Sequence, residues 1–130
     1  MPVELATALC VDDDPDVLAV TQACLEIEGE WNVITASCGK EALEIAEEVE
    51  PSAILLDFMM PEMDGLATLK SLRKISALDK VPIIFMTARV WQAEVSEYLA
   101  LGANGVISKP YDPMTLSAQI IDIWRKFDAR

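Results

Sequence analysis

The chain has 130 residues, 52% of them hydrophobic and 25% charged, so one compact domain with a buried core is expected. Ten Lys and Arg against 22 Asp and Glu give a net charge of -12, and no basic stripe is present, which argues against direct nucleic-acid binding. The sequence contains no histidine, which excludes Ser-His-Asp catalysis, His-ligated zinc and imidazole acid–base chemistry.

The remaining composition predicts a cytoplasmic protein. The three cysteines are widely spaced and are interpreted as reduced packing residues. The N-terminus has no basic segment before an apolar one, and every apolar run is shorter than a bilayer span, so neither secretion nor membrane insertion is expected.

Short apolar runs alternate with longer segments of helical periodicity along the chain. The apolar runs, which predict strands, are residues 6–11, 31–35, 53–56, 82–86 and 104–107. The periodic segments, which predict helices, are residues 15–27, 42–49, 66–75, 95–101 and 116–127. Five repeats of strand and helix predict an α/β fold: a doubly wound five-stranded parallel sheet flanked by five helices, in a single domain over residues 1–130.

Local signals refine the helix ends. Asp14 and Ser37 are placed to cap the first two helices, and Val49 is expected on the buried side of the second. The pairs Arg73-Lys74 and Arg125-Lys126 lie near predicted helix C-termini, where the helix dipole favours positive charge.

Polar residues follow four of the predicted strands and are expected at the same edge of the sheet. They are Asp12, Asp13 and Asp14 after the first strand, Asp57 after the third, Thr87 after the fourth and Lys109 after the fifth. Clustered carboxylates repel one another, a cost that a divalent cation relieves, and oxygen ligands favour magnesium, manganese or calcium over zinc. Each fragment alone is weak, because an acidic triplet before proline is more often a helix cap; their joint occurrence at successive strand ends is specific.

Four motifs in order carry a family resemblance that covers essentially the whole chain. They are residues 11–16 (Val-Asp-Asp-Asp-Pro-Asp), 56–65 (Leu-Asp-Phe-Met-Met-Pro-Glu-Met-Asp-Gly), 87–88 (Thr-Ala) and 102–110 (Gly-Ala-Asn-Gly-Val-Ile-Ser-Lys-Pro). The chain resembles the receiver domain of bacterial two-component response regulators, which implies a flavodoxin-like (βα)5 fold. The resemblance implies that Asp57 is the phosphoacceptor nucleophile.

The resemblance also implies the remaining site residues. Magnesium, with manganese as a substitute, would be held by Asp13, Asp57 and the backbone carbonyl of Met59, with Asp12 helping directly or through water. Thr87 would hydrogen-bond the phosphoryl oxygens, and Lys109 would pair with them as a cation. These roles agree with phosphoryl transfer, in which positioning and positive charge supply most of the acceleration.

Several positions beside the acceptor are of interest. The family usually has an aromatic switch residue three positions before the lysine, where this chain has Val106, so an aromatic rotamer switch is not expected. Pro110 resembles the family's cis-proline, which would aim the lysine into the pocket. Arg89 and Met59 flank the acceptor and could set water access and phosphoryl lifetime, with simple solvent exposure as the equal alternative.

The leading hypothesis is a stand-alone response regulator that takes phosphate from a sensor histidine kinase or histidine phosphotransfer protein. It would act through protein contacts, either as a phosphorelay shuttle or as a diffusible output protein with a downstream protein target. It would not be an enzyme beyond assisting its own phosphorylation and slow autodephosphorylation. The alternatives are a receiver excised from a hybrid kinase, a receiver-like module that signals without phosphorylation, and an aspartate-nucleophile phosphohydrolase whose nucleophile lies in the first loop.

Overall fold

The computed structural model describes residues 6–28, 31–49, 51–57, 65–87, 96, 99–100, 102–108 and 115–128. The strands are β1 (Thr7–Val11), β2 (Asn32–Ala36), β3 (Ala53–Asp57), β4 (Ile83–Thr87) and β5 (Gly105–Ser108). The helices are α1 (Pro15–Glu28), α2 (Gly39–Val49), α3 (Gly65–Leu72) and α5 (Leu116–Asp128), with a short 3-10 helix η1 (Ser76–Leu78) before β4. Ser96, Leu99 and Ala100 are helical and fall within the range 95–101 that is predicted to be a helix; the other residues of this range lie outside the described residues.

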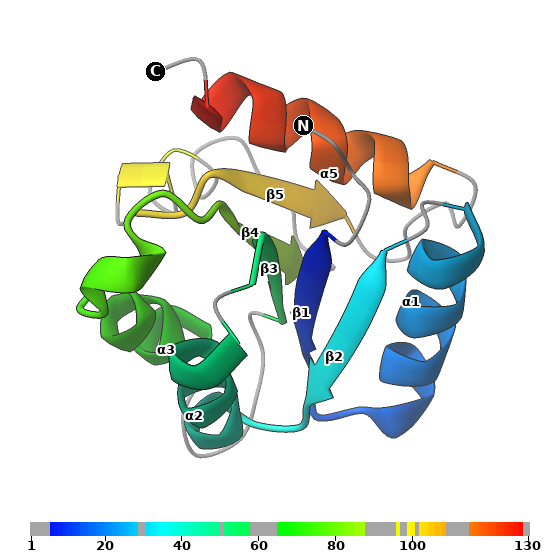
Figure 1. The fold of residues 1–130 in the computed structure, drawn as a ribbon, viewed down its shortest axis with the longest axis horizontal. Coiled ribbons are helices and arrows are strands. Elements are labelled where there is room, and N and C mark those ends of the chain that lie inside the picture. The colour runs from blue at the N-terminus through cyan, green and yellow to red at the C-terminus, as the bar shows by residue number, and fades with distance from the viewer. Residues whose placement is uncertain are drawn as a thin grey trace.

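The five strands form one sheet in the order β2-β1-β3-β4-β5, and every neighbouring pair is parallel (Figure 1). This arrangement confirms the predicted doubly wound sheet. The strand bounds differ from the predicted ones by one residue at several ends, so that Asp57 and Thr87 are the last residues of their strands rather than the first beyond them.

Helices cover both faces of the sheet, and each face has its own core. Alternate residues of β1 point to opposite sides: Leu9 and Val11 enter the core shared with α2 and α3, whereas Ala8 and Cys10 enter the core shared with α1 and α5. In Figure 1, α2 and α3 lie together on one side of the sheet, and α1 and α5 are neighbours. Because both faces are covered, β3 is buried along its whole length, which explains the apolar run that precedes Asp57.

The start of α1 is as predicted. The Asp14 Oδ1 atom accepts hydrogen bonds from the backbone N–H groups of Asp16 (2.9 Å) and Val17 (3.5 Å), and Pro15 is the first helical residue. Asp14 therefore caps the helix that follows the acidic triplet, and this cap orients the loop between β1 and α1.

Two predictions about α2 are wrong. The helix begins at Gly39, and Ser37 contributes its backbone N–H, which donates to the Glu41 carboxylate at 3.0 Å, rather than a side-chain cap to the helix. Val49 is 38% exposed, because it is the last residue of α2 and lies beyond Ala46, the last helix residue that is buried.

The helix dipole explains the position of Arg125 and Lys126 but not the contacts of Arg73. Arg125 and Lys126 lie in the last turn of α5, as expected, and Lys126 pairs with Asp122 at 3.2 Å. Arg73, directly after α3, instead directs its guanidinium to carbonyl oxygens of Leu78 and other residues in later segments of the chain.

The cysteines are all free thiols, in agreement with the absence of a disulfide framework. Cys10 is buried, and burial raises the pKa of its thiol to about 12. Cys24 and Cys38 are partly buried. In the part of the chain that the structure describes, no helix has both the length and the apolar character needed to cross a bilayer.

Candidate functional site

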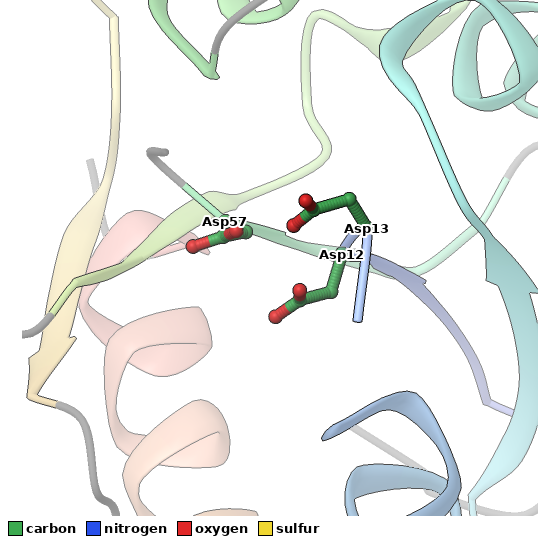
Figure 2. Close-up of side chains that lie close together, drawn as sticks. All are labelled: Asp12, Asp13 and Asp57. Atoms are coloured by element: carbon green, nitrogen blue, oxygen red, sulfur yellow. The ribbon is translucent and has the colours of Figure 1, made fainter. Parts of the chain in front are cut away.

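The carboxyl ends of β1 and β3 lie side by side at the centre of the sheet. Val11 pairs in register with Leu56, so Asp12, the residue after β1, lies next to Asp57, the last residue of β3. One carboxylate oxygen from each of Asp12, Asp13 and Asp57 lies within 4.8 Å of the others. Figure 2 shows the three side chains gathered at these strand ends, with Asp12 and Asp13 directed to the side where Asp57 lies.

The three carboxylates differ in exposure. Asp12 and Asp57 are each only 5% exposed, whereas Asp13 is exposed. The Asp12 backbone N–H donates to the Ala36 carbonyl (3.1 Å), which extends the β1–β2 pairing by one residue. Its Oδ1 atom accepts from the Asp14 backbone N–H (3.0 Å), so this side chain is held by the turn that leads into α1. The site therefore has a fixed, buried floor and one carboxylate at the solvent side.

This arrangement fits a hard divalent cation. Two carboxylates buried side by side repel each other and lose hydration, and a cation between them offsets both costs. The donors are carboxylate oxygens, which magnesium and manganese prefer to nitrogen or sulfur ligands. Asp12, Asp13 and Asp57 thus have the donor set, the proximity and the solvent access that such a site needs.

The other residues expected at this edge are only partly placed. Thr87 ends β4, the strand beside β3, and pairs in register with Ser108 of β5, the residue before Lys109. The Thr87 side chain is not among the described ones. Met59, Arg89, Lys109 and Pro110 also lie outside the described residues, so their expected positions remain predictions.

Val106 occupies a partly buried position on β5. It pairs in register with Phe85 of β4 and packs against the core shared with α2 and α3. Phe85 is fully buried. At this position the Val106 side chain packs against the core. A valine has neither a ring that could change rotamer nor a hydroxyl that could form a hydrogen bond when the residues at the strand ends change.

The sequence did not indicate the contacts of Arg73 and Asn104. The Arg73 Nη2 group donates to Asn104 Oδ1 at 2.6 Å, and these residues are 31 positions apart. The only available signals were an arginine directly after an apolar helix and an asparagine directly before an apolar strand, and neither signal names a partner.

A parallel α/β sheet with a carboxylate cluster at the ends of the neighbouring strands β1 and β3 defines a class of domain with an acidic pocket suited to a divalent cation. A family model of the response regulator receiver domain matches residues 8–121, and the chain belongs to this family. Receiver domains are parts of the response regulators of two-component systems, and the family binds Mg²⁺ at an acidic pocket. The resemblance inferred from the four motifs is confirmed.

Solved structures agree with this assignment. The chemotaxis protein CheY4 of Vibrio cholerae is 31% identical with a TM-score of 0.86, and the match covers 92% of this chain and 98% of that chain. A CheY-like response regulator receiver domain protein from Methanospirillum hungatei is 28% identical with a TM-score of 0.84, covering 97% of this chain and 98% of that one.

Curated relatives are longer. The alkaline phosphatase synthesis transcriptional regulatory protein PhoP of Bacillus subtilis is 37% identical over 118 residues, which are 91% of this chain and 48% of that protein. The response regulator Rre1 of Synechocystis is 34% identical over 115 residues, which are 88% of this chain and 50% of that protein. The chain therefore spans about half the length of the curated relatives it matches.

Proposed function

We propose that this receiver domain accepts a phosphoryl group on Asp57 from a phosphohistidine of a sensor histidine kinase or a histidine phosphotransfer protein. The observation that supports this proposal is the convergence of Asp12, Asp13 and Asp57 within 4.8 Å at the ends of the neighbouring strands β1 and β3. These 130 residues include no histidine, so the phosphohistidine that donates the group lies outside them.

The acidic residues carry the first part of the proposed mechanism. Asp12, Asp13 and Asp57, with the Met59 backbone carbonyl, would hold Mg²⁺ or Mn²⁺. When bound, the cation offsets negative charge on the acceptor and the incoming phosphoryl oxygens. An Asp57 carboxylate oxygen forms a bond to phosphorus as the N–P bond of phosphohistidine breaks, and the electron pair of that bond stays on the imidazole nitrogen. An ionised carboxylate needs no general base.

Two further residues complete the phosphoryl site in this proposal. Thr87 would donate its hydroxyl to a phosphoryl oxygen, and Lys109 would pair with the phosphoryl group as a compact cation. Slow autodephosphorylation would follow when water attacks the phosphorus of the acyl phosphate: the bond to the Asp57 oxygen breaks, inorganic phosphate leaves and the Asp57 carboxylate is restored. Arg89 and Met59, two residues after Thr87 and Asp57 respectively, would govern how readily that water enters.

The output is proposed to be a protein contact. The near full-length match to the chemotaxis protein CheY4 favours a diffusible receiver that acts on a downstream protein target. The curated relatives, of which the chain spans about half, favour a second candidate: a receiver that controls an attached output region, which in transcriptional regulators would bring nucleic acid into the whole protein's function. The size of the endogenous polypeptide distinguishes the two.

The test is phosphorylation by a small acyl phosphate in the presence of Mg²⁺, followed by intact-mass measurement. The native protein should gain one phosphoryl mass, which chelation of the metal should prevent. Asp57→Asn should abolish the gain. Asp122→Asn, a substitution of the same type at an exposed position of α5, should leave it unchanged.

Peptide mapping of the modified residue separates the alternatives. A phosphoryl group on Asp12 rather than Asp57 would indicate an aspartate-nucleophile phosphohydrolase. Absence of a mass gain with acyl phosphates and with a phosphorylated histidine phosphotransfer protein would contradict the proposal and favour a module that signals without phosphorylation.

A further inference from the structure

Arg73 connects three segments of the chain, and the most distant of them, the entry of β5, lies 29 to 31 positions away in the sequence. Its Nε group donates to the Gly102 carbonyl at 3.1 Å, and its Nη1 group donates to the carbonyls of Leu78 and Val81, each at 3.0 Å. Its Nη2 group donates to Asn104 Oδ1 at 2.6 Å. One side chain thus ties the end of α3 to the turn before β4 and to the entry of β5.

Asn104 and Gly102, the two partners of Arg73 next to β5, are themselves held in place by local structure. The Asn104 Oδ1 atom that accepts from Arg73 also accepts the Ile83 backbone N–H at 2.8 Å, and the Asn104 N–H donates to the Ile83 carbonyl at 2.8 Å. Gly102 has a φ of 115°, and a Cβ at this position would lie 3.4 Å from Arg73 Cγ. The arginine stem therefore lies over a backbone turn that favours glycine.

The charge of Arg73 makes the cluster hard to open. The guanidinium is partly buried, and burial lowers its pKa, an effect that the nearby Asp79 carboxylate opposes. Arginine nevertheless stays ionised in proteins, so its N–H groups need acceptors wherever water is excluded. Over the described ranges, every buried side-chain nitrogen or oxygen has a partner. Displacing the entry of β5 would break hydrogen bonds to a charged donor, which are stronger than neutral ones.

The cluster lies at the edge of the sheet opposite the acidic site. Asn104, which accepts from Arg73, also accepts the backbone N–H of Ile83, the first residue of β4. Asn104 directly precedes Gly105, the first residue of β5. Thr87, at the other end of β4, belongs to the carboxyl edge where Asp57 ends β3. The connection between β4 and β5 thus leaves the sheet at the edge of the acidic site and returns at the edge that Arg73 holds.

We propose that Arg73, Gly102 and Asn104 form a fixed anchor for the connection between β4 and β5. The anchor holds the returning end of this connection against Ile83, so a rearrangement that begins at the Thr87 end turns about the anchor and does not displace the start of β5. The trigger for that rearrangement rests on the proposed phosphorylation of Asp57, whereas the anchor itself rests only on the contacts of Arg73.

Hydrogen exchange followed by mass spectrometry tests the anchor. Arg73→Met keeps an apolar stem but removes every donor, and Arg73→Lys keeps the charge with a compact head that cannot reach all four acceptors. In Arg73→Met we expect exchange of the peptide 102–108 to accelerate about tenfold, with a smaller increase in Arg73→Lys. The peptide 53–57 should be unchanged. Lys74→Met, which alters the adjacent exposed cation, should leave both peptides unchanged.

Two results would overturn the anchor: equal acceleration of both peptides, which indicates only a loss of global stability, or no acceleration of 102–108. If Arg73→Met does not fold, Arg73→Lys and Asn104→Leu, which removes the shared acceptor, are judged by the same comparison.

Phosphorylation provides the second measurement. With Mg²⁺ and a small acyl phosphate, the native protein should change exchange in the peptide 83–87 and not in 102–108, whereas Arg73→Lys should change both. A change of equal size in both peptides of the native protein would contradict the fixed anchor. Lack of a mass gain on Asp57 both with the acyl phosphate and with a phosphorylated histidine phosphotransfer protein would refute the proposed function, and the unphosphorylated comparison would still decide the anchor.

Discussion

Removing one carboxylate from the acidic cluster should stabilise the metal-free protein. Asp13 is the most informative of the three to replace, because it is exposed and its substitution disturbs the packing around the site least. Asp13→Asn keeps the size and shape of the side chain and removes one negative charge that lies within 4.8 Å of the Asp12 and Asp57 carboxylates. The substitution therefore isolates the electrostatic cost of the cluster.

The size of the effect follows from the separation of the charges. Two unit charges 4.8 Å apart repel by about 1 kcal/mol at the dielectric constant of water and by about 3.5 kcal/mol at an effective value of 20. The exposure of Asp13 places both of its pairs near the lower figure, and physiological salt screens them further. We expect Asp13→Asn to raise the metal-free free energy of unfolding by about 1 kcal/mol.

Magnesium should reverse the order of stability. At a concentration of 100 times its Kd, a ligand stabilises the native state by about 2.7 kcal/mol, whereas a variant with hundredfold lower affinity gains only about 0.4 kcal/mol. The assay is urea unfolding with chelator and with Mg²⁺. Glu44→Gln, which removes one charge from the exposed face of α2, controls for the change in net charge. A less stable Asp13→Asn without metal, or equal stabilisation of variant and native protein by Mg²⁺, would refute the reasoning.

Three further predictions concern the framework of the site. In Gly105→Ala the new Cβ would lie 2.6 Å from Ile123 Cδ1, so the variant should unfold about 1–2 kcal/mol more easily in urea, and Ile123→Val should recover part of the loss. The Trp31 indole N–H donates to Ser117 Oγ at 3.0 Å in the interior. Trp31→Phe and Ser117→Ala should each cost about 1–3 kcal/mol, with the double variant costing less than their sum; strict additivity would show that the bond is not made. Burial raises the pKa of Cys10 from 9.0 to about 12. Below pH 9 both states hold the thiol proton; above it only the native state does, so stability falls by about 1.4 kcal/mol per pH unit up to about pH 12. Cys10→Ala should lack this part of the alkaline decline, and an identical decline would contradict the shift.

The arrangement of the sheet could be predicted because a buried strand requires apolar residues, and the sequence shows these directly. The first four residues of β3 are apolar since helices cover both of its faces, and this pattern is typical of central parallel strands. Once the strands are parallel, their carboxyl ends share one edge, and the neighbouring positions of Asp12 and Asp57 follow.

The errors in α2 have a local cause. Periodicity alone does not distinguish Val49, which lies past the last buried residue, from Ala46, which reaches the core. The predicted Ser37 cap was wrong because the sequence does not show which residue first adopts helical angles, and the capping residue depends on that position. In the structure the backbone N–H of Ser37 donates to the Glu41 carboxylate instead.

By itself, the amino-acid sequence determined the class of fold, the alternation of its elements and the carboxylates that gather at one edge, because these depend on burial and on residues close to strand ends. Only the tertiary structure decided which polar groups bind each other: Arg73 with Asn104, 31 positions away, and Trp31 with Ser117, 86 positions away. A hydrogen bond depends on the distance and direction of two atoms in space, and two residues far apart in the chain carry no local pattern that records it.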